Sequence, residues 1–324
     1  MNELAADYDF ALPAELIASR PLAERDASRM LVLHRGLGQI EHRRFRDLCD
    51  YLKPGDLVVL NDSRVIKARL LSHDRRVELL LIESMGPRKW NCLVKPGRKM
   101  RPGFELVIAG TTARVREILE DGSRLVEFDS EPDLARLGSM PIPPYFRREA
   151  DEQDEIRYQT VFAEAPGSVA APTAGLHFTP ELLSRIPHAQ VTLHVGIGTF
   201  LPIKVERIAD HSMHSERYLI SENAARAINA AARILAVGTT SVRVLESQPT
   251  GPITPRSGST NIFIYPPYTF RRVGALLTNF HLPKSTLLML VCAFAGREEV
   301  LAAYAEAIRE RYRFFSYGDC MLVI

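Results

Sequence analysis

The segment Ala275 to Gly296, ALLTNFHLPKSTLLMLVCAFAG, decides the fold, because it places a polar stretch between two strongly apolar ones. Pro283 ends the first apolar stretch, a predicted strand, since proline cannot donate to a strand ladder. Ser285 is a favourable helix N-cap, and the run Leu287 to Ala295 is apolar on every face. The segment therefore predicts a strand, a tight loop and a helix that protein covers on all sides.

A helix of this kind exposes only its N-terminus, where free N–H groups and the helix dipole favour an anionic group. Polar residues gather at this end of the predicted helix, and we expect a ligand site among them. They are Asn279, His281, Lys284, Ser285 and Thr286.

The composition is that of an ordinary globular protein. The chain has 324 residues, 46% hydrophobic and 25% charged, which is enough for two domains. No apolar run reaches the ~20 residues that cross a bilayer, and the N-terminus lacks a signal-peptide pattern, so we expect a cytoplasmic protein. The four cysteines form no C-x-x-C pair, which argues against a zinc knuckle or a disulfide framework. A net charge of +2 leaves the partner open.

Helix and strand patterns alternate at both ends of the chain, as is typical of an α/β domain. The predicted elements are strands at 30–34, 56–61, 189–195 and 234–237, and helices at 43–52, from Thr179, at 221–233 and from Thr240. Between them, short β-rich runs separated by turn residues predict a small barrel or sandwich, and we take it as an inserted barrel. The fold class is therefore α/β, with a mixed α/β main domain (residues 1–62 and 155–324) and an inserted small β-barrel domain (residues 63–154).

Two loops are built so that a ligand can approach the backbone. GSVAAPTAGLHF, residues 167–178, has small uncharged residues; tight surface packing explains this too, but His177 favours a site. HVGIGTF, residues 194–200, has two glycines after a strand. It lacks the third glycine and the helix of a dinucleotide fingerprint, and His194 alone can also be a core histidine.

Two further motifs carry polar groups. HSMHSE, residues 211–216, offers two imidazoles and a carboxylate, which suit a metal, an acid/base role or a solvated turn. VGTTSVR, residues 237–243, sets hydroxyls between a strand and a helix, where they can cap the helix or bind a carboxylate or phosphate. Capping does not explain Arg243.

A basic turn, KPGRKMRPG at residues 95–103, lies in the predicted barrel. A charge run is commonly solvated surface. The same turn also suits an RNA backbone, because phosphates require charge and not sequence-specific geometry.

Several long motifs occur in order from Tyr8 to the C-terminus: LPAELIASRPLAERDASRMLVL, GDLVVLNDSRVIKARL, SVAAPTAGLHFTPELL, HVGIGTFLPI, MHSE, VGTTSVRVLES, LLTNFHLPKSTLLMLVCAFAG and YRFFSYGDCMLV. Together they resemble the S-adenosylmethionine:tRNA ribosyltransferase-isomerases of queuosine biosynthesis. The resemblance implies an α/β body with an inserted β-barrel.

The resemblance also implies a reaction. The ribosyl part of S-adenosylmethionine moves to the aminomethyl group of 7-aminomethyl-7-deazaguanine at the wobble position of tRNA, and rearranges to give epoxyqueuosine. Adenine and methionine leave. S-adenosylmethionine is then a co-substrate, and we expect no true cofactor, no metal and no membrane partner. We also expect a monomer.

This chemistry needs a base beside the sulfonium and an acid for the departing adenine. The candidate catalytic residues are His177, His194, His214, His281, Glu216 and Asp319. The candidates for binding substrate are Thr173, Gly175, Phe178, Gly196, Gly198, Thr199, Thr239, Thr240, Ser241, Arg243, Asn279, Lys284, Ser285 and Thr286. The candidates for binding tRNA are Arg64, Lys95, Arg98, Lys99 and Arg101.

Two other classes of protein remain open. An RNA methyltransferase would use the same co-substrate and a basic surface, but it would release S-adenosylhomocysteine and no free adenine. A binding protein with the barrel as its RNA module would keep its function after His177 or His281 is replaced by alanine.

Overall fold

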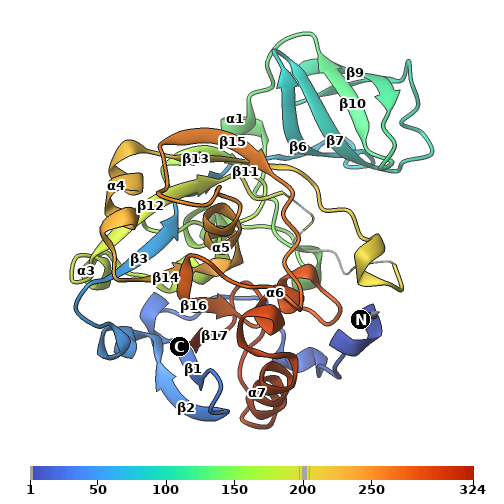
Figure 1. The fold of residues 1–324 in the computed structure, drawn as a ribbon. Coiled ribbons are helices and arrows are strands. Elements are labelled where there is room, and N and C mark those ends of the chain that lie inside the picture. The colour runs from blue at the N-terminus through green and yellow to red at the C-terminus, as the bar shows by residue number, and fades with distance from the viewer. Residues whose placement is uncertain (1–2, 197, 199–202, 204) are drawn as a thin grey trace.

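The structure is a computed structural model that describes residues 3–196, 198, 203 and 205–324. Figure 1 shows a large body with a central sheet, and a smaller curled sheet that projects from it. Within the described residues the body holds a nine-stranded sheet in the order β15-β13-β12-β3-β14-β16-β17-β1-β2. These strands are β1 Arg29–His34, β2 Gln39–Arg44, β3 Asp56–Asn61, β12 His188–Leu193, β13 Glu216–Ile220, β14 Arg233–Val237, β15 Arg256–Thr260, β16 Val273–Asn279 and β17 Cys320–Val323.

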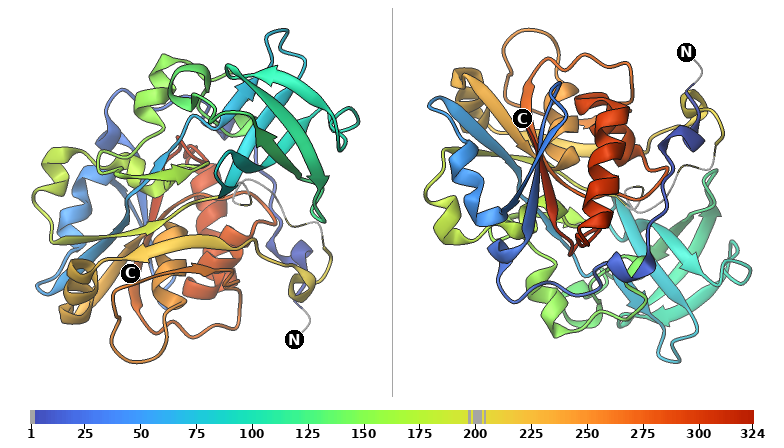
Figure 2. Two further views of the ribbon diagram at one scale, coloured as in Figure 1. Left: turned by 90° about the horizontal axis from the view of Figure 1, so that it is seen from above. Right: turned by 90° about the horizontal axis from the view of Figure 1, so that it is seen from below.

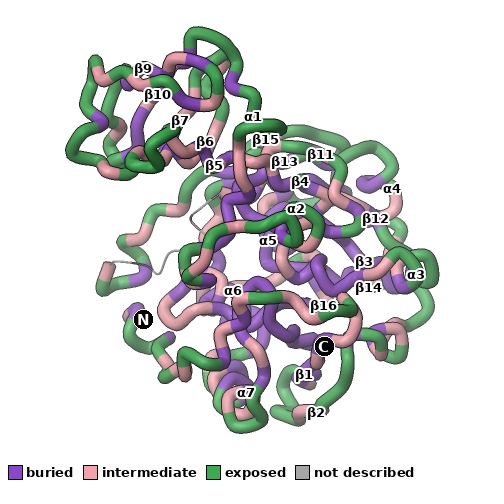
Figure 3. The backbone as a smooth tube through the Cα atoms, turned by 180° about the vertical axis from the view of Figure 1, so that it is seen from behind, coloured by how far each residue is buried: buried purple, intermediate pink, exposed green. Residues whose placement is uncertain are grey.

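The centre of this sheet is parallel and buried on both faces. β12, β3, β14 and β16 run parallel, whereas β17 is antiparallel to β16. Along β3, Leu57 and Val59 join one apolar cluster, and Val58 and Leu60 join the other. Buried parallel strands carry near-continuous apolar runs for this reason. Figure 3 shows the buried strands inside a more exposed shell.

Helices cover the first of these faces, and shorter segments cover the second. The α-helices of the described residues, whether or not they cover this sheet, are α1 Leu134–Leu137, α2 Glu152–Arg157, α3 Pro180–Leu183, α4 Glu222–Ala230, α5 Gly238–Glu246, α6 Thr286–Ala295 and α7 Arg297–Arg309. Residues of α4 to α7 join the cluster of Leu57 and Val59, while Phe45 and Leu182 join the other. No helix among the described residues is long and apolar enough to cross a membrane.

The predicted strand, loop and buried helix are confirmed as β16, the loop from Phe280 to Ser285, and α6. The Ser285 hydroxyl accepts a hydrogen bond from the N–H of Leu288 at 3.2 Å, as an N-cap does. Lys284 has a φ of +54°, so the chain turns sharply just before the helix. The helix is buried on nearly all sides.

The helix predicted at residues 43–52 is found in part, but it starts later and is of the 3₁₀ type. The chain there continues as β2 to Arg44, paired with β1, and then forms a short 3₁₀ helix, Phe45–Tyr51. Phe45 and Leu48, three residues apart, are its buried positions, which suits a three-residue turn. The helix predicted at 221–233 also ends earlier, because Arg233 begins β14 and pairs with Asp56.

The inserted segment forms a six-stranded antiparallel sheet in the order β5-β6-β7-β10-β9-β8. Its strands are β5 Arg69–Leu71, β6 Glu78–Gly86, β7 Lys89–Lys95, β8 Glu105–Ile108, β9 Thr111–Ile118 and β10 Arg124–Phe128. Within the described residues the ladder ends at β5 and β8, so the sheet is an open, curled half-barrel and its ring is not closed. It has a separate apolar cluster that includes Leu79, Val115 and Val126.

A two-stranded parallel pair, β4 Ser63–Val65 and β11 Ala165–Ser168, joins the inserted sheet to the body. The chain therefore leaves the body and returns to it at the same place. Both views in Figure 2 show the insert on one side of the body.

Glu246, at the end of α5, fixes the start of β16. Its fully buried carboxylate accepts hydrogen bonds from the backbone N–H groups of Arg271, Arg272 and Val273 at 2.9 to 3.1 Å. Glu246→Gln replaces one acceptor oxygen by an NH₂ group, which cannot accept from these backbone N–H groups. We therefore expect the free energy of unfolding to fall by about 1–3 kcal/mol. Urea denaturation at neutral pH measures this change.

The matched control is Glu222→Gln, because Glu222 is exposed and pairs only with Arg226 one turn away. We expect it to change the free energy of unfolding by less than about 0.5 kcal/mol. Equal losses in the two variants would contradict the role given to Glu246.

Candidate active site

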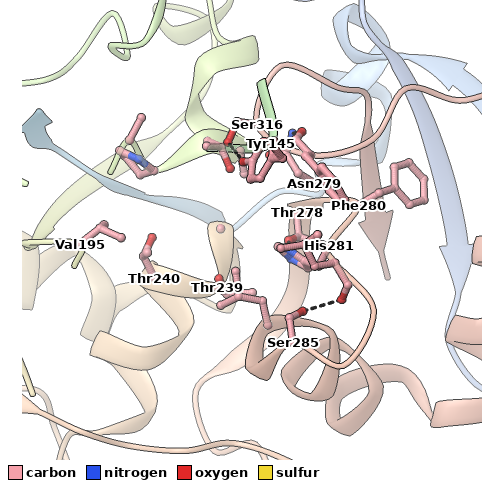
Figure 4. A pocket seen from close by; sticks show the side chains of 18 residues that line it. Tyr145, Val195, Thr239, Thr240, Thr278, Asn279, Phe280, His281, Ser285 and Ser316 are labelled. Atoms are coloured by element: carbon pink, nitrogen blue, oxygen red, sulfur yellow. Dashed lines mark hydrogen bonds between the residues drawn. The ribbon is translucent and has the colours of Figure 1, made fainter. Parts of the chain in front are cut away.

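A cavity lies beside the carboxyl ends of β14 and β16 and the N-terminus of α6 (Figure 4). We call it the inner cavity. Ligands commonly bind at this edge of an open α/β sheet. The predicted residues that line it are Thr173, Thr239, Thr240, Asn279, His281 and Ser285. Segments far apart in the sequence thus meet at one point.

Asn279 presents an unused acceptor at this cavity. Its Nδ2 donates to the carbonyl oxygens of Phe315 at 3.1 Å and Asp319 at 3.4 Å. Its Oδ1 is buried and has no hydrogen-bond partner among the described residues. A buried acceptor without a partner is costly, so it marks a place where a donor on a ligand would be stabilising.

The His177 ring contacts the side chain of Asn279. Its Nε2 lies 3.4 Å from Asn279 Nδ2, and its Nδ1 lies 2.9 Å from Ser28 Oγ. Burial, helped by the charges of Arg25 and Arg313, lowers the pKa of His177 to about 3, so the ring is neutral at neutral pH. His177 does not line the inner cavity and contacts it through Asn279.

His281 lines the inner cavity directly. Burial lowers its pKa to about 3, so this imidazole is also neutral at neutral pH. Its Nε2 is 2.7 Å from Thr278 Oγ1, and its backbone N–H donates to the Tyr304 hydroxyl at 2.9 Å. These contacts hold one ring nitrogen in place, while Nδ1 has no hydrogen bond to a described residue. A neutral imidazole with a free nitrogen can accept a proton.

Helix capping does not account for the hydroxyls of residues 239–241. Val237 is the N-cap of α5 and makes no side-chain cap, while Ser241 Oγ donates to Val237 O at 2.8 Å. Thr240 Oγ1 is buried without a partner among the described residues. Thr239 and Thr240 therefore stay available for a ligand.

A second, larger cavity of about 420 Å³ lies between the body and the insert. We call it the cleft cavity. Its volume falls within the range of small-molecule sites. The predicted residues that line it are His194, Gly196, Gly198, His214 and Glu216. Val195 lines both cavities, so the two meet at this residue.

A buried ion pair links the elements around the two cavities. Glu216 of β13 pairs with Arg243 of α5, and its other oxygen accepts from Gly196 N at 2.9 Å. Arg243 is 3% exposed, and its Nε and Nη2 have no partner among the described residues. Thr240, whose buried hydroxyl also has no partner among the described residues, lies on the same helix. The hydroxyl of Thr240 and the two nitrogens of Arg243 are therefore unused donors that lie close together in the sequence.

The histidines in and near the cleft cavity have different neighbours. His194 Nδ1 lies 2.9 Å from Ser63 Oγ, and burial together with the charge of Arg217 lowers the pKa of this ring. His211 packs edge-on against Phe263 and does not line the cleft cavity, whereas His214 does. Among the described residues no three His, Cys, Asp or Glu side chains stand together as metal ligands.

The remaining predicted residues that the structure describes line neither the inner nor the cleft cavity. They are Gly175, His177, Phe178, Ser241, Arg243, Lys284, Thr286 and Asp319. Lys284 Nζ pairs with Asp9 at 2.7 Å, and Phe178 packs in the core against Phe45. Asp319 accepts from the backbone N–H groups of Arg29 and Arg313, each at 2.8 Å. Thr199 lies outside the described residues.

Sequence reasoning missed Tyr145 and Ser316, which also line the inner cavity and lie 2.6 Å apart through their hydroxyl oxygens. Tyr145 comes from the proline-rich run PIPPY, residues 141–145, to which sequence reasoning assigned no site. An aromatic residue directly after PIPP was the available signal, because a simple connection has no need of a partly buried ring.

The predicted RNA-contact residues are exposed on and beside the insert: Arg64, Lys95, Arg98, Lys99 and Arg101. Among the described residues none of them pairs with a carboxylate within 4.0 Å, unlike Arg114 and Arg116 on β9. Their charge is therefore open to a partner.

Comparisons with known proteins give relatives over nearly the full length. A protein from Pelobacter propionicus called S-adenosylmethionine:tRNA ribosyltransferase-isomerase is 52% identical, with 99% of each chain covered. One of the same name from Symbiobacterium thermophilum is 50% identical, covering 98% of this chain and 99% of its own.

A crystal structure of S-adenosylmethionine tRNA ribosyltransferase from Thermotoga maritima is also similar. It has 42% sequence identity and a TM-score of 0.57, over 98% of this chain and all of the other. The sequence model described as queuosine biosynthesis protein matches residues 5–323. With matches of this length and identity, the chain belongs to the queuosine biosynthesis protein family.

Proposed function

We propose that this protein is a transferase that moves and isomerises the ribosyl part of S-adenosylmethionine. The acceptor is 7-aminomethyl-7-deazaguanine at the wobble position of tRNA, the product is epoxyqueuosine, and adenine and methionine are released. The observation that carries this proposal is the inner cavity. It combines an unused acceptor, an unused hydroxyl and a neutral imidazole in a chain about half identical to enzymes of that name.

The inner cavity suits the amino-acid end of S-adenosylmethionine. Thr240 Oγ1 can donate to the carboxylate, and Asn279 Oδ1 can accept from the ammonium group, which would satisfy both buried atoms. Tyr145 and Phe315, whose ring centroids are 4.8 Å apart, also line the cavity. Aromatic faces stabilise a cation such as the sulfonium.

His281 is the residue we assign to proton transfer beside the sulfonium. It is the predicted histidine that lines the inner cavity, and its Nδ1 has no hydrogen bond to a described residue. The ribosyl group would then lie near Val195, where the inner cavity meets the cleft cavity.

Residues 63–154 form, in this proposal, an inserted domain that binds tRNA, with residues 1–62 and 155–324 as the main domain. The separate apolar cluster of the insert supports such a division. Its exposed basic turn faces solvent and suits phosphates. We place the enzyme in the cytoplasm with its tRNA, and we propose that it acts as a monomer.

His281→Ala is expected to reduce the rate of adenine release from S-adenosylmethionine by about 100-fold or more, because a positioned acid/base group contributes at least that much. Chromatography of free adenine in reactions with precursor-bearing tRNA measures the rate, and circular dichroism checks the fold. His188→Ala is the control, since His188 is exposed on β12 and lines neither cavity.

Retention of full activity in the His281 variant would remove this residue from the mechanism. Formation of S-adenosylhomocysteine without free adenine by the unaltered enzyme would establish a methyltransferase instead.

Thr240→Val keeps the shape of the side chain and removes its hydroxyl. Because a hydrogen bond to a charged group contributes about 1.5–3 kcal/mol, we expect the KM for S-adenosylmethionine to rise by roughly 10-fold or more. Initial rates over a range of co-substrate concentrations give this value. Thr112→Val, on β9 of the insert, should leave KM unchanged, and an equal KM in both variants would refute the carboxylate contact.

The double variant Arg98→Ala, Lys99→Ala should weaken tRNA binding and leave the KM for S-adenosylmethionine unchanged. The slope of log affinity against log salt concentration should fall by about one for each phosphate that the variant no longer neutralises. Filter binding across a salt series measures both quantities. Arg76→Ala is the control, because Arg76 is an exposed residue of the same insert that pairs with Asp74. An unchanged salt slope in the double variant would place the RNA elsewhere.

A further inference from the structure

The cleft cavity has walls of two different kinds. The insert supplies the apolar side chains Ile82 and Leu93, the amide Asn91 and the carboxylate Asp121. The body supplies histidines and glycines from the segments around β12 and β13. The cavity thus combines apolar side chains with many hydrogen-bonding groups, and such a lining suits a flat heterocycle that carries polar substituents.

Glycines make room for the two histidines of this cavity. A Cβ atom on Gly167, which has a φ of +142°, would lie 2.9 Å from the His194 ring. A Cβ atom on Gly198 would lie 3.3 Å from His214 Cδ2. Side chains at these positions would push the rings from their places, so the glycines keep both imidazoles at the cavity.

Among the described residues, Asp121 is the acidic group of the cavity that has no arginine or lysine within 4.0 Å. Glu216 pairs with Arg243, and Glu83 lies 3.9 Å from Arg217 across the cleft. Asp121, in the turn between β9 and β10, accepts through Oδ1 from the N–H of Ser123 at 2.9 Å and from its hydroxyl at 2.5 Å. Its Oδ2 has no hydrogen bond to a described residue.

The surroundings of Asp121 keep it ionised. Burial raises the pKa of its carboxyl, but the hydrogen bonds from Ser123 and the charge of His214 outweigh burial, so the pKa lies below the ordinary value. His214 stands on the body, so this interaction crosses the cleft. An ionised carboxylate with a free oxygen favours a cationic ligand group.

We infer that the cleft cavity receives the modified nucleobase of the tRNA and that Asp121 binds its aminomethyl ammonium group. This inference rests on the proposed function. It gives the insert a second task besides phosphate contact, which is to select the base that carries the amine. The contact of both cavities at Val195 then puts this amine beside the ribosyl group of the co-substrate.

The test compares two tRNAs, one with 7-aminomethyl-7-deazaguanine and one with unmodified guanine at the wobble position. Asp121→Asn should bind the amine-bearing tRNA about 10-fold or more weakly, because it removes a charge-assisted hydrogen bond. Its affinity for the guanine tRNA should not change, and Asp121→Glu should restore part of the preference. Asp129→Asn, an exposed carboxylate of the same insert, is the control.

Three results would overturn the inference. In the first, Asp121→Asn binds both tRNAs as tightly as the unaltered enzyme does. In the second, Asp121→Asn binds both tRNAs equally weakly, which would mean that Asp121 has only a structural role. In the third, Asp129→Asn also loses the preference for the amine-bearing tRNA, which would show a general effect of negative charge on the insert. The proposed function is judged separately: it fails if the unaltered enzyme releases no adenine with the amine-bearing tRNA.

Discussion

The burial of α6 on nearly all sides is the constraint on which the rest of the site depends. A helix enclosed in this way cannot offer its side chains to a ligand, so only the loop before it can do so. The Ser285 cap and the turn at Lys284 fix where that loop ends. Because β16 is held at its start by Glu246, strand, loop and helix form one rigid frame around the inner cavity.

Within this frame the protein leaves polar atoms without partners. Asn279 Oδ1, Thr240 Oγ1 and two nitrogens of Arg243 are buried and unpaired among the described residues. Each costs free energy in the unliganded protein, of the order of 1–3 kcal/mol for a neutral group. Asn279 and Thr240 line the inner cavity, where a ligand could satisfy both atoms, whereas Arg243 lies outside it and the buried carboxylates of Glu246 and Asp319 accept from backbone donors.

Much of the frame was predictable from the sequence, because local pattern determines it. The apolar runs of β3, β14 and α6 and the cap at Ser285 are properties of short segments. The helix expected at residues 43–52 starts two residues later, because Arg43 and Arg44 pair with β1, and the rest of it is a 3₁₀ helix. The closed barrel was not found: turn spacing predicts the strands of the insert but not whether its two edge strands meet.

The site itself was predictable only in part. Thr239, Asn279 and His281 line one cavity, whereas Lys284 forms an ion pair with Asp9 and does not line it. Tyr145 and Asp121 come from segments that carry no motif of their own. Their place depends on how the insert and the chain after it return to the body, which no local pattern contains.

The meeting of the two cavities at Val195 has a kinetic consequence. In the arrangement proposed above, this one residue would border both substrates, so its volume would act on both at the same time. In a reaction that joins a ribosyl group to an amine, the rate depends on the distance between them at the moment of encounter. The size of a single valine is thus a measure of how closely the two reactants are brought together.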